Sequence, residues 1–204
     1  MAEFEHYFAP GTTGLTLLLL HGTGGDENDL VPVGRGLAPG AALLSPRGKV
    51  SEQGMLRFFS RPGPDGFDHA EIRTRAGELA EWVRLSAERY GLDAKRIHGL
   101  GYSNGANMAA ALMQVAPDLL AGACLLRARA ILETAETCDL TGKSVLIAAG
   151  QSDAVIPVEG ARELAETLRD AGANVDLVVQ NAGHELTPAD FNLGKQWFAR
   201  FIAG

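Results

Sequence analysis

The sequence is poor in the features that mark several large classes of protein. Its 204 residues include only two cysteines, Cys124 and Cys138, so no disulfide framework is expected, and neither cysteine has metal-ligand spacing. No apolar run approaches the roughly 20 residues that span a bilayer. The acidic segment 1–6 lacks the basic start and the apolar stretch of a signal peptide, which favours a cytoplasmic protein.

Basic residues are also scarce, with 18 Lys and Arg against 25 Asp and Glu and a net charge of −7 at pH 7. Nucleic acids and anionic membranes favour basic patches, so this balance argues against both as partners. A glycine-rich loop at 22–25 matches neither a phosphate-binding loop nor a dinucleotide fingerprint. We therefore expect no cofactor and no metal.

Short apolar runs alternate with helical patterns along most of the chain. Hydrophobic residues make up 46% of the sequence, and its length suits a single globular domain over residues 1–204. Strands are expected at 4–8, 15–20, 41–44, 96–102, 122–126, 144–149 and 175–180, and helices at 69–90, 106–113, 158–171 and 188–201. Such strands predict an α/β fold: a mostly parallel sheet of about seven strands, with helices on both faces and no large cap domain.

Smaller features accompany this pattern. Thr187 and Pro188 form a plausible N-cap and first helical position for the last helix. Cys124 lies in an apolar run and is expected to be buried, whereas Cys138 lies in a polar stretch and is expected to be a free surface thiol.

Residues 46–68 are rich in Gly and Pro and break the regular pattern. A long irregular loop of this kind is usually functional. We expect it to wall a substrate pocket, with these residues as candidates for substrate binding: Met55, Leu56, Arg57, Phe58 and Phe59. Arg57 could meet a carboxylate or a phenolic oxygen. The competing interpretation is that Phe58 and Phe59 only pin the loop to the core.

Ser103 is at the centre of a Gly-x-Ser-x-Gly pentapeptide between an apolar run and a helix-forming segment. A strand that turns sharply through a serine into a helix places that hydroxyl on a strained corner. Gly101 and Gly105 flank the corner, where a Cβ would collide with the neighbouring strand or helix. The motif indicates a nucleophile, although glycine-rich turns of this kind are common.

A serine nucleophile needs a base, and the base needs a carboxylate that orients it. In this type of fold the chain order is Ser, then Asp or Glu, then His. Asp153 comes just after the apolar run 145–149, and His184 lies between the last strand and the last helix. We therefore expect Ser103, Asp153 and His184 to form a catalytic triad.

The same chemistry requires two backbone N–H groups that stabilise a developing oxyanion. The residue after the nucleophile, Asn104, is expected to supply one. The second is expected from Thr23, in the glycine-rich loop that follows the strand at 15–20. His21 is expected to order this loop rather than to act as a second base.

These motifs resemble the α/β-hydrolase superfamily, in its phospholipase/carboxylesterase family of small esterases with little lid. The resemblance spans nearly the whole chain and rests on segments 19–30, 45–48, 57–59, 101–106, 149–157 and 183–186. Bacterial hydrolases linked to hydroquinone resistance and acyl-protein thioesterases are similar members. One departure is that Arg127 is followed by Ala128, where the closer relatives have proline, and this affects expectations about substrate more than about the triad.

The resemblance implies a serine carboxylesterase that acts on small esters through an acyl-enzyme. An acyl thioesterase or a lysophospholipase-type hydrolase is the main alternative, and a non-catalytic binding protein of the same fold is a remote one. A small-molecule ester is the expected partner. The sequence leaves a monomer and a homodimer equally open.

Overall fold

The computed structural model describes residues 3–63, 66–132 and 138–202. Its main sheet has seven strands in the order β1-β3-β2-β6-β7-β8-β9. The strands are β1 His6–Ala9, β2 Thr16–Leu20, β3 Ala42–Pro46, β6 Ile97–Tyr102, β7 Gly122–Leu126, β8 Ser144–Gly150 and β9 Asn174–Gln180. Strand β1 is antiparallel to β3, and the other neighbouring pairs are parallel. The predicted α/β fold with a mostly parallel sheet is confirmed.

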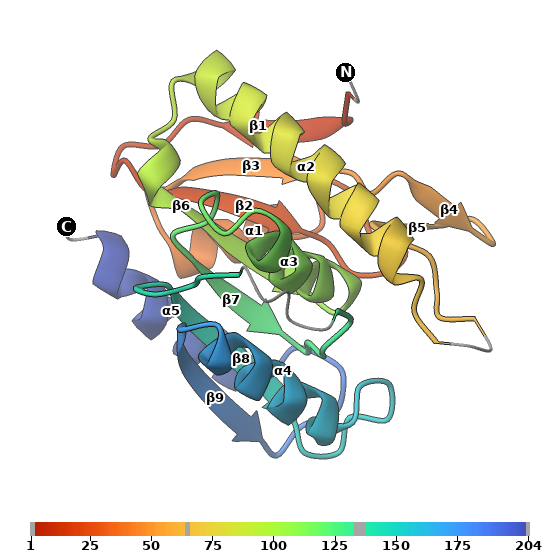
Figure 1. Cartoon of the computed structure of the whole chain (residues 1–204). Coiled ribbons are helices and arrows are strands. Elements are labelled where there is room, and N and C mark those ends of the chain that lie inside the picture. Colours follow the sequence, from red (N-terminus) through yellow and green to blue (C-terminus); the bar gives the residue numbers. More distant parts are fainter. Residues whose placement is uncertain (1–2, 64–65, 133–137, 203–204) are drawn as a thin grey trace.

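Five helices cover the two faces of this sheet (Figure 1). They are α1 Val31–Leu37, α2 His69–Tyr90, α3 Asn104–Val115, α4 Val158–Asp170 and α5 Pro188–Ile202. Helices α2, α3 and α4 lie on one face, and α1 and α5 lie on the other. None of the helices within the described ranges is long and apolar enough to cross a membrane.

The burial of β2 shows why four of its five residues are leucines. Leu18 and Leu20 belong to the core cluster under α2, α3 and α4, whereas Leu17 and Leu19 belong to the cluster under α1 and α5. Because side chains alternate across a strand and both faces are covered, a central strand has no polar face. Because the strands other than β1 are parallel, their carboxyl ends lie at one edge of the sheet.

Several details differ from the sequence-based expectations. Residues 46–68 are not wholly irregular, because β4 Val50–Glu52 and β5 Met55–Arg57 pair as an antiparallel hairpin. Helix α1 was not predicted: it is two turns long and contains two glycines, so it carries no helical pattern. Gly34 in α1 lies so close to β2 that a Cβ there would come within 3.0 Å of the Leu19 side chain.

The two cysteines occupy different environments. Cys124 is buried in β7, as expected. Cys138 is also a free thiol, as expected, and it is half-buried because it packs against the larger core cluster. Most of the polar stretch that suggested exposure, residues 133–137, lies outside the described residues.

Candidate active site

Ser103 lies at the corner between β6 and α3, at the carboxyl edge of the sheet. Its φ of 52° is in the left-handed region, which is uncommon for a residue with a side chain. The flanking glycines make the corner possible: a Cβ on Gly101 would lie 2.6 Å from the Ala106 backbone, and one on Gly105 would lie 2.0 Å from the Leu20 carbonyl oxygen. The tight turn leaves the Ser103 side chain facing a cavity.

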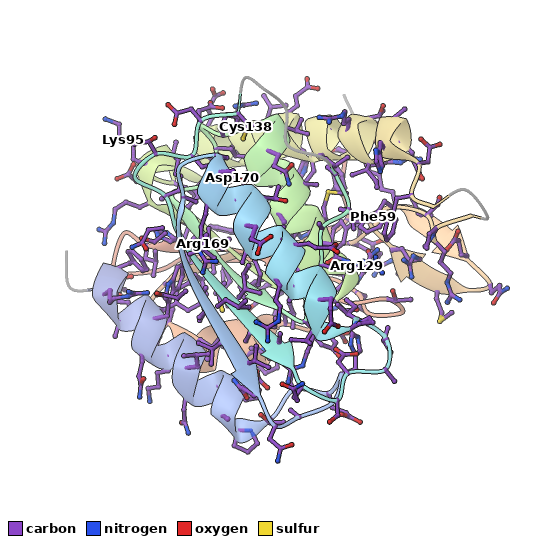
Figure 2. The ribbon with its side chains drawn as sticks, turned by 60° about the horizontal axis from the view of Figure 1, so that its bottom comes forward. Phe59, Lys95, Arg129, Cys138, Arg169 and Asp170 are labelled. Carbon is purple, nitrogen blue, oxygen red and sulfur yellow. The ribbon has the colours of Figure 1, made fainter. Side chains whose placement is uncertain are left out.

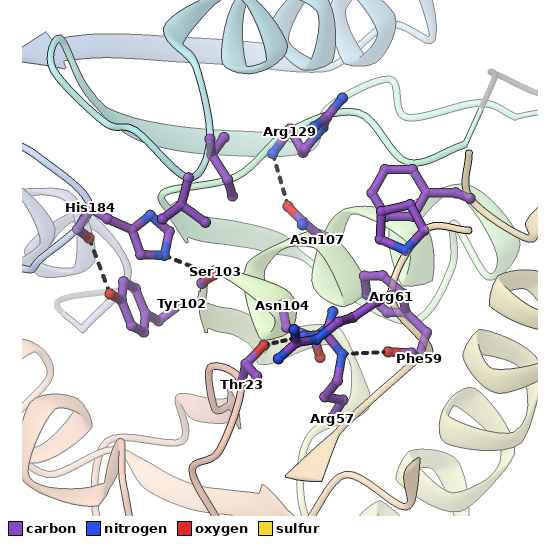
Figure 3. Close-up of a pocket in the computed structure, with 14 residues that line it drawn as sticks. Thr23, Arg57, Phe59, Arg61, Tyr102, Ser103, Asn104, Asn107, Arg129 and His184 are labelled. Atoms are coloured by element: carbon purple, nitrogen blue, oxygen red, sulfur yellow. Dashed lines mark hydrogen bonds between the residues drawn. The ribbon is translucent and has the colours of Figure 1, made fainter. Parts of the chain in front are cut away.

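His184 and Asp153 meet this serine from two other loops at the same edge, and Figure 3 shows His184 next to Ser103. His184 Nε2 is 3.0 Å from Ser103 Oγ, and His184 Nδ1 is 2.8 Å from Asp153 Oδ2. A carboxylate can only accept, so Nδ1 donates to Asp153, and Nε2 accepts the hydroxyl proton of Ser103. The structure thus brings together the three residues predicted as a triad.

Asp153 is held in place by the turn after β8. Its Oδ1 accepts the N–H groups of Val155 and Ile156, each at 2.8 Å. Its side chain is 1% exposed, whereas that of His184 is 22% exposed. The carboxylate is therefore fixed and shielded from solvent, while the imidazole reaches the cavity.

Arg127 fixes the backbone on both sides of His184. This arginine follows β7 directly, has a φ of 57° and makes five side-chain hydrogen bonds. It donates to the carbonyl oxygens of Gly183 and Glu185, each at 2.9 Å, and forms a buried bidentate pair with Asp190 at 2.8 Å. An arginine placed directly after a core strand was the only sequence signal for this role.

Asp190 in turn ties this network to the start of α5. Thr187 donates both its N–H and its hydroxyl to Asp190 Oδ2, and α5 begins at Pro188, as predicted. Burial acts to raise the pKa of Asp190, but the hydrogen bonds from Arg127 and Thr187 outweigh it and hold the pKa below its ordinary value. The carboxylate therefore stays charged opposite Arg127.

Thr23 and Asn104 both line the cavity beside Ser103. Asn104 is the first residue of α3, so its N–H is one of the helix-terminal amides without an intrahelical acceptor. In the loop after β2, Gly24 N–H donates to Leu56 O and Gly25 N–H donates to Gly22 O. These bonds direct the two later amides away from the cavity, and Thr23 is the residue of this loop that borders it.

His21 orders the same loop. Its Nδ1 is 2.7 Å from Gly22 O, and its Nε2 is 2.9 Å from the Gly48 N–H. Only a neutral imidazole can donate at one nitrogen and accept at the other. Burial lowers the pKa of His21, which maintains that neutral form. The ring therefore connects the β2 loop to the loop that leads into the hairpin.

The cavity has a volume of about 480 Å³. Besides Ser103 and His184, it is lined by Thr23, Arg57, Phe59, Arg61, Pro62, Phe67, Tyr102, Asn104, Asn107, Arg129, Val155 and Ile156. Of the five predicted substrate-binding residues, only Arg57 and Phe59 belong to this lining; Met55, Leu56 and Phe58 do not. Phe58 is buried, with its ring 4.8 Å from that of His21 and its N–H bonded to Asn104 Oδ1. Phe59 borders the cavity but is only 1% exposed, so both phenylalanines pack into the core, as the competing interpretation expected.

Tyr102 completes the wall next to the imidazole. Its ring lies 5.4 Å from that of His184, and its hydroxyl donates to His184 O at 3.1 Å. Burial raises the pKa of Tyr102, so the phenol keeps its proton and this hydrogen bond. Within the described ranges, no group of three or more His, Cys, Asp and Glu side chains is arranged to hold a metal ion.

Comparisons with known proteins fit this geometry. The family model described as Phospholipase/Carboxylesterase matches residues 59–199. The chain is 39% identical over 198 residues to MhqD of Bacillus subtilis (strain 168), a protein assigned as a hydrolase, with 97% of this chain and 99% of MhqD covered.

Solved structures agree with the sequence relatives. The carboxylesterase of Bacillus cereus is 39% identical and superposes with a TM-score of 0.93, covering 98% of this chain and 95% of that one. YahD, determined with malic acid, is 29% identical with a TM-score of 0.91 and covers 98% and 100%. The chain therefore belongs to the phospholipase/carboxylesterase family and is an esterase.

Proposed function

We propose that the chain is a serine carboxylesterase that hydrolyses small carboxylic esters through an acyl-enzyme on Ser103. The observation that carries this is the continuous line of hydrogen bonds from Asp153 through His184 to Ser103 at the wall of an open cavity. Membership of a carboxylesterase family supports the same reaction.

The first half of the reaction forms the acyl-enzyme. Ser103 Oγ attacks the ester carbonyl carbon while His184 Nε2 takes the hydroxyl proton. The carbonyl oxygen becomes an oxyanion, to which the backbone N–H groups of Asn104 and Thr23 donate. His184 then gives its proton to the leaving alkoxide, and an alcohol departs.

The second half releases the acid. His184 takes a proton from a water molecule, and the resulting hydroxide attacks the acyl carbon. The tetrahedral intermediate collapses, Ser103 Oγ recovers a proton from His184, and the carboxylic acid leaves. Asp153 holds the imidazole in one tautomer and stabilises its protonated form throughout.

The cavity favours small substrates. Its volume of about 480 Å³ is within the range of small-molecule sites, and it opens directly at the edge of the sheet. Two similar structures point the same way: one is a carboxylesterase, and the other was determined with malic acid, a small polar acid. Acyl thioesters and lysophospholipids remain the alternative substrates that the assay must include.

The test compares hydrolysis of 4-nitrophenyl acetate by the wild type, Ser103→Ala and Ser144→Ala. Ser144 starts β8, at the end of that strand opposite the Asp153 loop, and provides a matched serine-to-alanine control. We expect Ser103→Ala to lose at least about 10³-fold in kcat, since the residual rate without a nucleophile is small. We expect the control to retain the wild-type rate.

Equal activity in Ser103→Ala and the wild type would refute the proposed nucleophile. A fluorophosphonate probe separates an enzyme from a binding protein, because only an activated serine hydroxyl reacts with it. Faster turnover of acetyl thioesters than of matched oxygen esters would replace the carboxylesterase by a thioesterase with the same site.

A further inference from the structure

Three arginines, Arg57, Arg61 and Arg129, line the cavity beside Ser103 (Figure 3). The described lining contains no Asp or Glu, although the chain as a whole has a net charge of −7. A cavity of one charge sign with low-dielectric walls concentrates ligands of the opposite sign. The positive charge of the cavity wall therefore favours an anionic ligand, although the protein as a whole is acidic.

Two of the three arginines already have partners in the protein. Arg57 Nε lies 3.5 Å from Glu52 Oε2, and Arg61 Nε lies 3.7 Å from the same oxygen. Arg57 also donates to Phe59 O at 3.0 Å and to Thr23 Oγ1 at 2.6 Å. These bonds give Arg57 a structural task, namely joining the hairpin to the β2 loop.

Arg129 has no comparable partner in the described part of the chain. Its side chain makes no ion pair with a described residue, and its Nε is buried without a hydrogen-bond acceptor among them. The guanidinium lies 5.4 Å from the centroid of the Phe67 ring. The Nε packs against α4 at Gly160, so a ligand in the cavity would meet the terminal nitrogens of the guanidinium, which have no hydrogen-bond or ion-pair partner among the described residues.

The fold nevertheless holds Arg129 in place. Its backbone N–H donates to Asn107 Oδ1 at 2.9 Å, which ties the loop after β7 to α3. Arg129 lies beside α4 (Figure 2), and a Cβ added to Gly160 of that helix would come within 2.9 Å of Arg129 Cβ. The glycine makes room for the arginine stem, and the cation is positioned before any ligand arrives.

We propose that Arg129 binds a carboxylate of the substrate, so that the preferred substrates are esters with a second, negatively charged carboxylate. This inference rests on the proposed esterase function and names its substrate class. A guanidinium fork matches a carboxylate in shape and charge. The apolar side chains of Phe67 and Pro62 suit the hydrocarbon or aromatic body that joins the carboxylate to the ester.

The test uses two matched pairs of esters. In one pair the carboxylate is on the leaving group: 4-acetoxybenzoate against the neutral 4-acetoxybenzamide. In the other it is on the acyl group: the mono-4-nitrophenyl ester of adipic acid against 4-nitrophenyl hexanoate. The readout is the ratio of kcat/KM for the anionic ester to that for the neutral ester.

The variants are Arg129→Met, Arg129→Lys and the control Arg84→Met. Arg84 is paired with Asp118 on the exposed surface and does not line the cavity. In at least one pair, we expect Arg129→Met to lower the ratio by about 10-fold or more, as for a lost charged hydrogen bond. We expect Arg129→Lys to lower the ratio less and Arg84→Met to leave it at the wild-type value.

Ionic strength provides a second readout that requires no variant. Added salt should lower kcat/KM of wild type for the anionic ester more steeply than for the neutral ester. An unchanged ratio in Arg129→Met for both pairs, or equal salt dependence, would overturn the inference while the esterase function stands. Failure of wild type to cleave any of the four esters would instead overturn the proposed function and this inference with it.

Discussion

Arg127 and Arg129 are two residues apart in the same loop, yet their surroundings differ completely. The Arg127 side chain is 0% exposed, and Asp190 together with three carbonyl oxygens satisfies its donors. Arg129 borders the cavity, and its Nε has no acceptor among the described residues. The protein itself satisfies the donors of Arg127, whereas Arg129 is the arginine that we propose to bind a ligand.

His98 is a buried basic residue that has neither an acidic partner among the described residues nor access to the cavity. The His98 ring lies 6.0 Å from that of Trp197 and 4.4 Å from that of Phe201. The charged groups that act on it, Arg96 and Lys143, are both positive and so disfavour its protonated form. Burial lowers the pKa of His98 to about 4. A histidine can escape the cost of a buried charge by losing its proton, whereas an arginine cannot.

The largest effect is expected from the loss of Arg127. Arg127→Met leaves the Asp190 carboxylate buried without its partner, which costs about 3–5 kcal/mol of unfolding free energy. It also frees the carbonyls on both sides of His184, so we expect kcat to fall while KM changes little. Denaturant unfolding and steady-state kinetics, measured below the unfolding transition, check the two effects.

A paired substitution sharpens this result. Arg127→Met combined with Asp190→Leu removes both charges, so its unfolding free energy should lie above that of Arg127→Met alone. A single variant as stable as the wild type would show that the Arg127–Asp190 pair does not hold this region together.

The pH dependence of stability tests the contrast with His98. Its folded pKa of about 4 lies below its unfolded value of about 6.5, so the unfolded state binds more protons between these limits. Stability should therefore fall as pH decreases from about 6.5 to 4, by at most about 3 kcal/mol from this group. His98→Leu should show a shallower loss in that window.

Thermal unfolding of wild type and His98→Leu at pH 7.5, 6.0 and 5.0 measures this difference. Other acidic groups contribute to both curves, so the comparison between the two proteins carries the result. Parallel curves for wild type and variant would mean that His98 does not contribute to the loss of stability between about pH 6.5 and 4.

The smallest expected effect on stability is that of Arg129→Met. No described carboxylate depends on Arg129, and the methionine stem can occupy the path along Gly160, so we expect a change within about 0.5 kcal/mol. Denaturant unfolding beside Arg127→Met gives the comparison directly. A loss as large as that of Arg127→Met would assign Arg129 a structural role.

Much of the site could be predicted because it depends on local sequence. The corner at Ser103 needs glycines at fixed positions, and Asp153 and His184 follow strands that are recognisable as apolar runs. Parallel strands bring their carboxyl ends to one edge, so chain order alone places these three residues near one another. The predicted strands agree with the observed ones to within a few residues.

The cavity wall could not be predicted in the same way. Residues 55–57 form the second strand of a short hairpin and residues 58–59 follow it, and of these five only Arg57 and Phe59 line the cavity. Arg129 comes from a loop far along the chain, and its role depends on the lack of an acidic side chain in the described lining of the cavity. Such roles arise from tertiary contacts, and no local spacing records them.

The most direct test of the central claim is to find the acyl group itself. The protein is mixed with 4-nitrophenyl acetate, quenched in acid within the first turnovers, digested and analysed by mass spectrometry. We expect one acetyl group on the peptide that contains Ser103, and none on that peptide in Ser103→Ala. Acetylation of a different residue at the rate of turnover would contradict the claim.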